Sequence, residues 1–458
     1  MQPLFSLEPP GATAPPVMLF EGDATEVGAS LGGPVDLAYL DPPFASGYRY
    51  ASTTTMSCGS GTTTVRRPAF RDPFHRRPAE YVRFLAPRLA AALDALRPGG
   101  SLYVHLDWRV AAHVRVHLDE VLGDAALRNE LIWRRNPPLG RKARAGQFGR
   151  VTDTILLYAK PGGAPTFHPQ TTTRPVPRSG YRLDPETGRA FRTAPRGDYT
   201  DESIRRLEAE GRIHRTRTGK IRIRYDLEPG PPDEDGPTWL ERQAVDSLWT
   251  DIPDAMHVPP SERTGYPTQK PERLLARVVE ASSNPGDLVF DPFCGSGTTL
   301  VAAVSRGRRA SGADVSAPAI ETAFGRLAAL GVPVRVFGRG AGPSATPALR
   351  AVRDGASRVR LVSYQPPEVP DWPGAREAAE AARASAGLPL LEGWGVAPRE
   401  TDGGLRLGGW FARDPEEHCV PWAANVPNLE AADGAPRVLA WDVLGNRVLA
   451  PVEDSQTR

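Results

Sequence analysis

The stretch Leu288-Val-Phe-Asp-Pro-Phe-Cys-Gly-Ser-Gly-Thr-Thr299 combines three features in the order that decides the fold. Leu288 to Phe290 is a short apolar run, typical of a buried strand. Asp291 follows it, then Gly295 and Gly297, and Thr298 opens a helical pattern. Glycines at a strand-to-helix turn let a ligand approach the backbone, and the helix start offers free N–H groups. The stretch therefore predicts a strand, a ligand-binding turn and a helix.

A second acid supports this interpretation. Asp314 follows Asp291 by 23 residues, at the end of the next expected strand, Arg309 to Ala313. A carboxylate at this place accepts hydrogen bonds from ribose hydroxyls in nucleoside-binding α/β folds. The alternative is a glycine turn that serves packing alone, and the spaced carboxylate argues against it. The turn lacks the Gly-Lys-Ser/Thr ending of a phosphate loop, so we do not expect an NTPase.

Asp41-Pro42-Pro43-Phe44 ends another apolar run, Val35–Leu40. The prolines fix the backbone and remove N–H donors, so the Pro42 carbonyl can point at a ligand. An amine on an aromatic base is a poor nucleophile, because its lone pair is delocalised into the ring. The Asp41 carboxylate and the Pro42 carbonyl could accept its two hydrogens, while Phe44 stacks on the base. The alternative is an ordinary proline-rich turn.

Apolar runs and helical patterns alternate along most of the chain and predict a parallel α/β sheet. Residues 45–78 have little apolar content and are expected to form a long loop. Residues 161–265 form an insert with a hairpin around Ile213–Tyr225 and a turn at Pro229–Pro237, and Gly338–Pro347 is a linker. The other expected strands are Val17–Phe20, Ser101–Leu106, Glu130–Trp133 and Thr154–Tyr158, and the expected helices begin at Pro78, Val110, Pro271 and Pro318.

Charge is distributed unevenly, although the net charge is only +2. Leu131–Tyr225 holds 21 Lys/Arg against 8 Asp/Glu, whereas Leu361–Arg458 has a balance of −7. The middle segment suits a polyanion, although a GC-rich coding sequence would give the same excess of arginine.

The three cysteines are far apart in the sequence, which indicates a reducing compartment and no zinc site. No apolar run is long enough to indicate a membrane span or a signal peptide. We therefore expect a cytoplasmic protein.

The two motifs together identify a resemblance. Asp41-Pro-Pro-Phe44 early and Asp291-Pro-Phe-Cys-Gly-Ser-Gly-Thr-Thr299 late resemble the β-group amino-methyltransferases of bacterial restriction–modification systems, over residues 17–335. Further matching motifs are Phe20-Glu-Gly-Asp23, Pro98-Gly-Gly-Ser-Leu-Tyr-Val-His-Leu-Asp107, Glu130-Leu-Ile-Trp133, Leu248-Trp-Thr-Asp-Ile252 and Tyr266-Pro-Thr-Gln-Lys-Pro271. The resemblance implies a Rossmann-like class I methyltransferase sheet with helices on both faces and a permuted order of its halves.

The resemblance also implies domains and roles. The domains are a catalytic half (1–160), a target-recognition insert (161–265), a cofactor-binding half (266–338) and a small β-containing accessory domain (348–458). S-adenosylmethionine is the implied cofactor, and no metal is expected. The implied catalytic residues are Asp41, Pro42, Pro43 and Phe44, and the implied cofactor-binding residues are Asp23, Thr268, Gln269, Lys270, Asp291, Phe293, Gly295, Gly297, Thr298 and Asp314.

The implied reaction is methylation of adenine N6 in double-stranded DNA, because members with Asp in the first motif position mostly modify adenine. Cytosine N4 stays open as the target atom. The order of motifs argues against the related glutamine methyltransferases of translation factors, and the intact motifs argue against an inactive cofactor-binding fold. A modification subunit that needs a restriction endonuclease partner also stays open, as does a homodimer.

The amino group of the target base cannot be reached inside the duplex, so the base has to be unpaired and flipped out. We expect residues 45–78 to close over the DNA and the insert to contact phosphates and bases; a basic loop without contact is the alternative. The expected DNA-binding residues are Arg66, Arg67, Arg71, Arg76, Arg77, Arg134, Arg135, Arg141, Lys142, Arg144, Arg212, Arg215 and Arg217. His113 and His117 have a spacing that could bind metal but no further ligand, so we expect a structural role.

Overall fold

The computed structural model describes the chain except for residues 59–60, 136–147, 234–235, 340–348, 355–356, 398–399, 402–403, 415–416, 427–435 and 455–458. The described chain divides into two compact units, Met1–His168 with Ser247–Arg458, and Pro169–Asp246. Arg141, Lys142, Arg144 and positions 340–347 of the predicted linker lie outside the described residues. The four predicted domain boundaries stay predictions.

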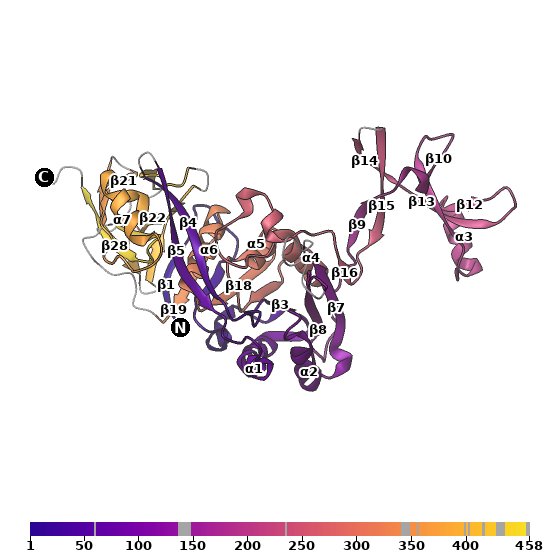
Figure 1. Cartoon of the computed structure of the whole chain (residues 1–458), viewed down its shortest axis with the longest axis horizontal. Helices are drawn as coiled ribbons and strands as arrows, with labels where there is room; N and C mark the ends of the chain where they lie inside the picture. Colours follow the sequence, from indigo (N-terminus) through magenta and orange to yellow (C-terminus); the bar gives the residue numbers. More distant parts are fainter. Residues whose placement is uncertain are drawn as a thin grey trace. The chain divides into compact units, whose positions relative to one another are not determined.

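Among the described residues, twelve strands form the main sheet of the first unit (Figure 1). Its six central strands run parallel in the order β6 (Leu96–Leu106), β3 (Val35–Leu40), β17 (Leu288–Asp291), β18 (Arg309–Asp314), β2 (Val17–Glu21) and β19 (Val334–Gly338). Beside β6 lie β8 (Thr152–Ala159), β7 (Leu127–Arg134) and β16 (Leu248–Trp249). Beside β19 lie β1 (Gln2–Leu7), β24 (Gly404–Leu407) and β23 (Glu400–Thr401).

The strand order interleaves distant parts of the sequence. The late strands β17 and β18 lie between the early strands β3 and β2, with Phe290 beside Ala38 and Asp314 beside Glu21. Since all four strands are parallel, their carboxyl ends meet at one edge of the sheet. Ligands of open α/β sheets bind at such an edge, in the crevice outside the carboxyl ends of the strands.

Helices cover both faces of this sheet, as Figure 1 shows. On one face lie α1 (Pro78–Ala95) and α2 (Ala111–Leu122); on the other lie α4 (Glu272–Ser282), α5 (Thr298–Val304) and α6 (Ala317–Ala329). Helix α1 buries Tyr81, Leu85 and Leu89, whose spacing of four residues places them on one side of the helix. They pack against β3 and β6 in one hydrophobic core. The predicted Rossmann-like α/β fold with permuted halves is confirmed.

The predicted long loop at residues 45–78 is wrong. Most of this segment forms a two-stranded hairpin of β4 (Arg49–Cys58) and β5 (Gly61–Arg71). Its many threonines are β-branched and favour extended backbone, and the two strands satisfy each other's backbone hydrogen bonds. Scarcity of apolar residues therefore did not mean absence of regular structure.

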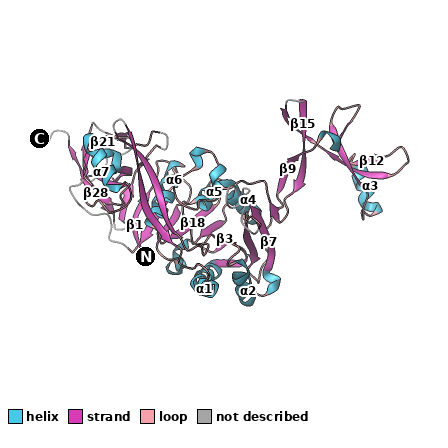
Figure 2. Cartoon of the chain, in the orientation of Figure 1, coloured by secondary structure: helices cyan, strands magenta, loops and turns pink. Residues whose placement is uncertain are grey.

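The second unit consists mainly of strands, together with helix α3 (Asp201–Ala209), as Figure 2 shows. Its described strands form one sheet of β10 (Arg182–Leu183), β11 (Ala190–Pro195), β13 (Ile221–Asp226) and β12 (Ile213–Arg215), and another of β14 (Glu228–Asp233), β15 (Gly236–Ala244) and β9 (Thr171–Pro175). The predicted hairpin at Ile213–Tyr225 is confirmed by β12 and β13. The predicted turn at Pro229–Pro237 is wrong over Pro229–Asp233, which belong to β14 and pair with β15 across a bulge.

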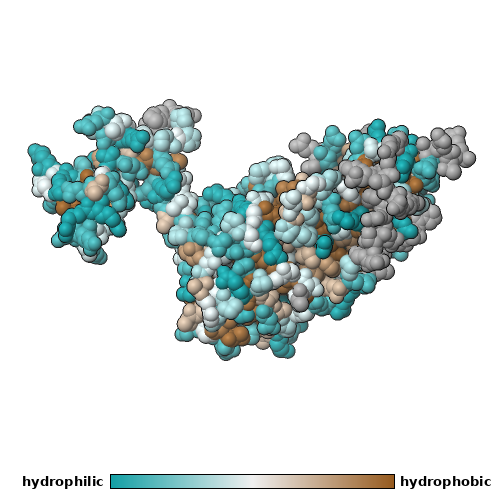
Figure 3. All heavy atoms as spheres, turned by 180° about the vertical axis from the view of Figure 1, so that it is seen from behind, coloured by the Kyte–Doolittle hydropathy of each residue, from teal (hydrophilic) through white to brown (hydrophobic). Residues whose placement is uncertain are grey.

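Hydrophobic burial in the second unit is small. Ile204, Leu207 and Ile223 form its core cluster between α3 and the four-stranded sheet. On the face shown in Figure 3, the surface of this unit is mostly hydrophilic. A unit of this size buries only part of its surface, so its small core is expected to stabilise it only modestly.

Residues 349–454 form what we call the C-terminal domain. Seven of its described strands make one sheet, in the order β25 (Trp410–Ala412), β22 (Leu391–Ala397), β27 (Arg437–Asp442), β28 (Arg447–Asp454), β20 (Leu349–Arg353), β21 (Arg358–Tyr364) and β26 (Ala423–Asn425). Helix α7 (Ala375–Ala382) packs into the same core. The predicted β-structure of this segment is confirmed, including the hairpin of β27 and β28, whereas its separation as an accessory domain stays a prediction.

Within the described residues, none of the helices combines the length and the apolar character needed to traverse a lipid bilayer.

Candidate active site

Four aspartates end or follow the neighbouring strands β3, β17, β18 and β2. They are Asp41, Asp291, Asp314 and Asp23. They come from both ends of the sequence and meet at the same edge of the sheet because β17 and β18 lie between β3 and β2. All four line one cavity of about 290 Å³.

The turn after β17 depends on its glycines. Gly295 and Gly297 have φ angles of 49° and 76°, in the left-handed region that favours glycine. A Cβ on Gly297 would lie 2.8 Å from the Cβ of Ala323, so only glycine lets α6 pack this closely. The N–H of Gly295 donates to Asp314 Oδ2 at 2.9 Å, which joins the turn to the end of β18.

Two of the acids sit in an environment that disfavours their charge. Burial raises the pKa of Asp291 to about 7, and the nearby charges of Asp41 and Asp314 add to this effect. Burial also raises the pKa of Asp314 to about 6, although backbone N–H groups of Ser316 and Gly295 favour its charged form. A hydroxyl donor from a ligand would relieve part of this penalty at Asp314.

The two carboxylate oxygens of Asp41 have different surroundings. Oδ2 forms an ion pair with Lys270, whose ammonium lies 4.8 Å from the centroid of the Phe44 ring. Within the described part of the chain, Oδ1 is buried and has no hydrogen-bond partner. A buried acceptor without a donor is costly, so this oxygen is suited to accept a hydrogen from a ligand.

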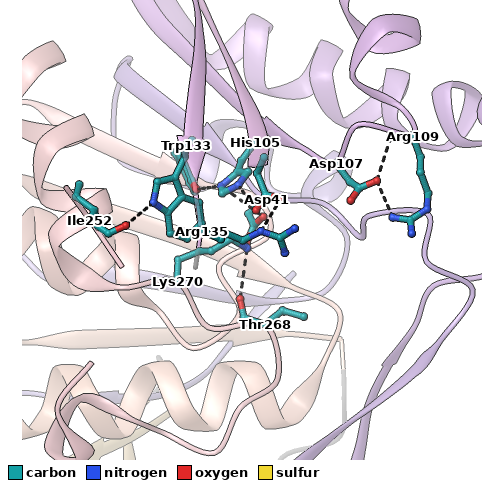
Figure 4. A network of polar contacts seen from close by, with 11 residues as sticks. Asp41, His105, Asp107, Arg109, Trp133, Arg135, Ile252, Thr268 and Lys270 are labelled. Atoms are coloured by element: carbon teal, nitrogen blue, oxygen red, sulfur yellow. Dashed lines mark hydrogen bonds and ion pairs between the residues drawn. The ribbon is translucent and has the colours of Figure 1, made fainter. Parts of the chain in front are cut away.

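A buried polar network lies behind Asp41 (Figure 4). His105 is fully buried and lies between Tyr39, whose hydroxyl is 2.7 Å from Nδ1, and Asp153, whose Oδ2 is 3.2 Å from Nε2. Its Nδ1 also lies 4.0 Å from Asp41 Oδ1. Burial raises the pKa of Asp153, but His105, Arg135 and Lys270 together outweigh this and lower it. Asp153 is therefore a charged partner that holds the His105 ring behind the Asp41 carboxylate.

The segment Tyr266–Lys270 forms another wall of the cavity. Gln269 holds this segment together, since its Oε1 accepts from the N–H and hydroxyl of Thr264 at 3.0 and 2.8 Å. Thr268 has a φ of 61°, which a residue with a Cβ adopts only when its surroundings enforce it. Lys270 leaves this wall to reach Asp41, so it lies nearer to the first motif than the sequence indicated.

Asp23 caps the short helix Ala24–Glu26 and forms an ion pair with Arg88 of α1. Burial raises the pKa of Asp23, but hydrogen bonds from Thr25 and the charge of Arg88 outweigh this and lower it. Arg88 lies over the ring of Phe84, at 4.0 Å from its centroid. Asp23 therefore stays charged and lies in the cavity wall beside an aromatic surface.

The predicted catalytic and cofactor-binding residues converge well. Apart from Gly297, which packs against α6, the residues that line the cavity include Asp23, Asp41, Pro42, Pro43, Phe44, Thr268, Gln269, Lys270, Asp291, Phe293, Gly295, Thr298 and Asp314. Thr298 also accepts a hydrogen bond from Arg326 at 3.0 Å.

Sequence reasoning missed an aromatic part of the wall. Tyr50 and Phe70 face each other across the base of the hairpin, with ring centroids 4.7 Å apart, and both line the cavity. Phe74, Phe84 and Tyr266 also line it. The sequence does offer a signal for this aromatic wall, since aromatic residues flank a threonine-rich stretch on both sides. The predicted loop over this stretch hid it.

The predicted DNA-binding arginines have different surroundings. Arg66, Arg71, Arg76, Arg77 and Arg134 are exposed, and so are Arg215 and Arg217 in the second unit, while Arg212 is half-buried. Arg67 forms an ion pair with Glu321 and its side chain is only 14% exposed, and Arg135 lies 3.3 Å from the buried Asp153. Both arginines thus have a carboxylate partner within the protein, and their contact with DNA stays a prediction. Arg141, Lys142 and Arg144 lie outside the described residues.

Among the described residues, no three His, Cys, Asp or Glu side chains gather as metal ligands would.

The permuted sheet, the glycine turn and the acids at the strand ends define a class I methyltransferase fold. The family model of the N6/N4 methylases, described as DNA methylase, matches residues 35–325, and the chain belongs to this family.

Three curated relatives share parts of the sequence. Type II methyltransferase M.EcaI of Enterobacter cloacae is 30% identical over 321 residues, which cover 65% of this chain and 65% of the relative. DNA adenine methyltransferase YhdJ of Escherichia coli is 37% identical over 111 residues, 24% of this chain and 36% of YhdJ. Type II methyltransferase M2.DpnII of Streptococcus pneumoniae is 50% identical over 64 residues, 14% of this chain and 24% of the relative. The chain thus spans less than two thirds of the length of each.

Proposed function

We propose that this chain transfers a methyl group from S-adenosylmethionine to N6 of an adenine in double-stranded DNA. The observation that carries the proposal is that Asp41 lines the same cavity as the glycine turn, and that its Oδ1 has no hydrogen-bond partner among the described residues. Membership of the DNA methylase family supports DNA as the substrate. The name of YhdJ, DNA adenine methyltransferase, supports adenine as the target base.

The residues of the cavity fit S-adenosylmethionine. Asp314 is a half-buried carboxylate that would accept from ribose hydroxyls, and removal from solvent raises its pKa although two backbone N–H groups favour the charged form. The backbone around Phe293 and Gly295 would hold the methionine portion, and Thr268 and Gln269 its carboxylate. When bound, S-adenosylmethionine supplies an electrophilic methyl group on a positively charged sulfur.

The first motif would prepare the target amine. Asp41 Oδ1 accepts one amine hydrogen and the Pro42 carbonyl accepts the other, so electron density moves from the N–H bonds toward the nitrogen. Pro42 and Pro43 hold this geometry because their φ angles are fixed. Phe44 offers its face to the base, and stacking of a flipped base on an aromatic side chain offsets part of the few kcal/mol needed to extrude it.

Lys270 would hold the Asp41 carboxylate in place. It pairs with Oδ2, and only 10% of the lysine side chain and 16% of the aspartate side chain are exposed. In such surroundings the pair is screened less by solvent than a surface pair. Lys270 would therefore act on the target amine only through the carboxylate that it holds.

DNA would be bound by exposed arginines, one of which, Arg71, also lines the cavity. Arg215 and Arg217 of the second unit and Arg66, Arg71, Arg76 and Arg77 of the first are exposed and suited to phosphate contacts. We also propose that a restriction endonuclease acts on the same sequence as a separate chain, and that two copies of this chain associate. A sedimentation measurement that finds only monomers would reject the dimer.

The test is methyl transfer by the purified full chain. Labelled S-adenosylmethionine and unmethylated duplex DNA are incubated with it, and the DNA is digested to nucleosides and separated. We expect the label in N6-methyladenine, and a loss of roughly 100-fold or more in Asp41→Asn, because removal of one preorganised hydrogen-bonding group costs this much in comparable sites.

The matched control is Asp94→Asn on the exposed side of α1, which should act as the unmodified chain does. Label in N4-methylcytosine would favour cytosine as the target. Label that appears only after addition of another protein would favour a subunit that needs a partner. Full activity in Asp41→Asn would reject the proposal.

A further inference from the structure

The β4–β5 hairpin has one buried face and one exposed face. Met56 and Val65 are fully buried, at 0% and 1% exposure. The strand register pairs Val65 with Thr54, two residues from Met56, so both side chains point to the same face. Thr53, Thr62, Thr64 and Arg66 on the other face are exposed.

The buried face packs into the C-terminal domain. Met56 and Val65 belong to the same hydrophobic cluster as Ala375, Ala378 and Trp394 of that domain. This cluster is separate from the core beneath the main sheet. An isolated two-stranded hairpin is only marginally stable in water, so this cluster is what stabilises the outer half of the hairpin.

Backbone contacts reinforce the packing. The N–H of Ser57 donates to the carbonyl of His418, and the N–H of Arg66 donates to the carbonyl of Pro373, each at 3.1 Å. Gly374 lies so close to β5 that a Cβ on it would be 2.0 Å from the carbonyl oxygen of Thr64. Its φ of 82° also favours glycine.

A shared carboxylate joins three parts of the first unit. Glu321 of α6 forms an ion pair with Arg67 of β5 and another with Arg447 of β28, whose Nε is 3.0 Å away. Arg447 also reaches Glu21 at the end of β2, at 2.7 Å. Because Glu321 is nearly buried, the loss of either arginine would leave uncompensated charge in a protected place.

The other end of the hairpin reaches the cavity. Tyr50 and Phe70 stack there, and Arg71 follows them in the cavity wall. The buried Asp72 accepts from the N–H and hydroxyl of Ser46 at 2.6 and 2.8 Å, which ties this end to the residues just after Phe44. Six residues of strand separate Tyr50 from Met56, about 20 Å at the usual rise per residue.

We propose that the C-terminal domain anchors the outer half of this hairpin, so that Tyr50, Phe70 and Arg71 form a fixed wall of the active site. Met56, Val65 and Gly374 are then positioning residues, and the hairpin does not act as a loop that closes over DNA. The role of this wall in catalysis rests on the proposed function, whereas the anchoring of the hairpin does not depend on it.

The experiment compares two variants of the full chain with matched controls. Val65→Thr keeps the shape of the side chain and places a hydroxyl in the apolar cluster, and its control is Val116→Thr on the exposed side of α2. Gly374→Ala introduces the clash with Thr64. Its control is Gly409→Ala, where the new Cβ would have only an ordinary contact at 3.5 Å.

Amide hydrogen exchange and methyl-transfer kinetics are measured on all four. We expect exchange within residues 49–71 to rise at least tenfold in Val65→Thr and Gly374→Ala, with little change in α1 or α4. We also expect kcat/KM for DNA to fall about tenfold in these two variants, and both controls to behave as the unmodified chain.

Unchanged exchange in residues 49–71 of both variants would overturn the proposal. Faster exchange with an unchanged kcat/KM would also overturn it, since the wall would then need no anchor. The exchange measurement requires no catalysis, so it decides whether the domain anchors the hairpin even if the chain methylates no DNA.

Discussion

The pairing of Lys270 with Asp41 joins residues 229 positions apart, and neither motif alone indicated it. The resemblance implies a place for Lys270 near the carboxylate of the cofactor, whereas the geometry places its ammonium on Asp41, the proposed catalytic acid. These two roles have different kinetic consequences, because a cofactor contact affects binding and a contact with Asp41 affects the methyl-transfer step.

We predict that Lys270→Met lowers kcat roughly 10- to 100-fold, since hydrogen bonds to charged groups are worth about 1.5–3 kcal/mol. The dissociation constant for S-adenosylmethionine should change less than threefold. Single-turnover kinetics and equilibrium binding measure the two effects. A large loss of cofactor affinity with normal single-turnover rates would assign Lys270 to the cofactor instead.

Asp314 gives a prediction about pH. Its pKa in the free protein is raised to about 6 by burial, and ribose hydroxyls would favour the charged form. Binding should therefore require loss of a proton below pH 6, and affinity for S-adenosylmethionine should fall by up to about tenfold per pH unit there. Calorimetry between pH 5 and 8 measures this.

The control for this pH prediction is Asp314→Asn, which should bind weakly without the same pH dependence. Asp291, whose pKa is raised to about 7, is tested in parallel with Asp291→Asn. If the affinity of Asp314→Asn for S-adenosylmethionine still falls as the pH is lowered, another group is responsible for the pH dependence.

At the scale of elements, the central strands and the glycine turn were predictable. Their apolar runs are short, end in aspartate and are followed by turn residues, so local sequence determines both strand and boundary. The hairpin at Arg49–Arg71 was not predictable from local sequence. Its Met56 and Val65 find their partners in a domain that begins nearly 300 residues later, at Leu349.

The functional site, too, was predictable only where local sequence determines it. Acids and glycines within one motif were assigned correctly to one cavity, because the chemistry of a strand end is local. Arg67 and Arg135 are predicted to contact DNA from charge alone, but each also has a carboxylate neighbour in the protein, Glu321 and Asp153. Composition cannot distinguish an exposed arginine from one whose carboxylate partner lies far away in sequence.

The arginines of the second unit that are predicted to contact DNA give a prediction for this element. Replacement of Arg212, Arg215 and Arg217 by alanine should flatten the plot of log K against log salt by up to about three units, since each lost phosphate contact removes nearly one. Arg212 and Arg215 also pair with Glu210 and Glu208, so the measured change indicates how many arginines exchange these partners for phosphate.

The control variant removes the same amount of charge from the C-terminal domain. In it, alanine replaces Arg358, Arg360 and Arg376. The salt slope of this variant should equal that of the unmodified chain. Equal slopes in both triple variants would exclude the second unit from phosphate contact.

At the scale of the molecule, the strand order explains how a catalytic motif and a cofactor turn separated by 250 positions form one site. β3 and β17 are neighbours, with Phe290 beside Ala38, so Asp41 and Asp291 emerge at the same edge. The family match covers residues 35–325, and the C-terminal domain lies beyond it. In this chain the domain nevertheless reaches the active site through the hairpin.

The most direct test of the central claim is methylation-aware sequencing of DNA from cells that express the chain or its Asp41→Ala variant. We predict N6-methyladenine at one short recognition sequence with the unmodified chain, and none with the variant. Adenine methylation that persists undiminished with Asp41→Ala would contradict the account, as would modification found only at cytosine.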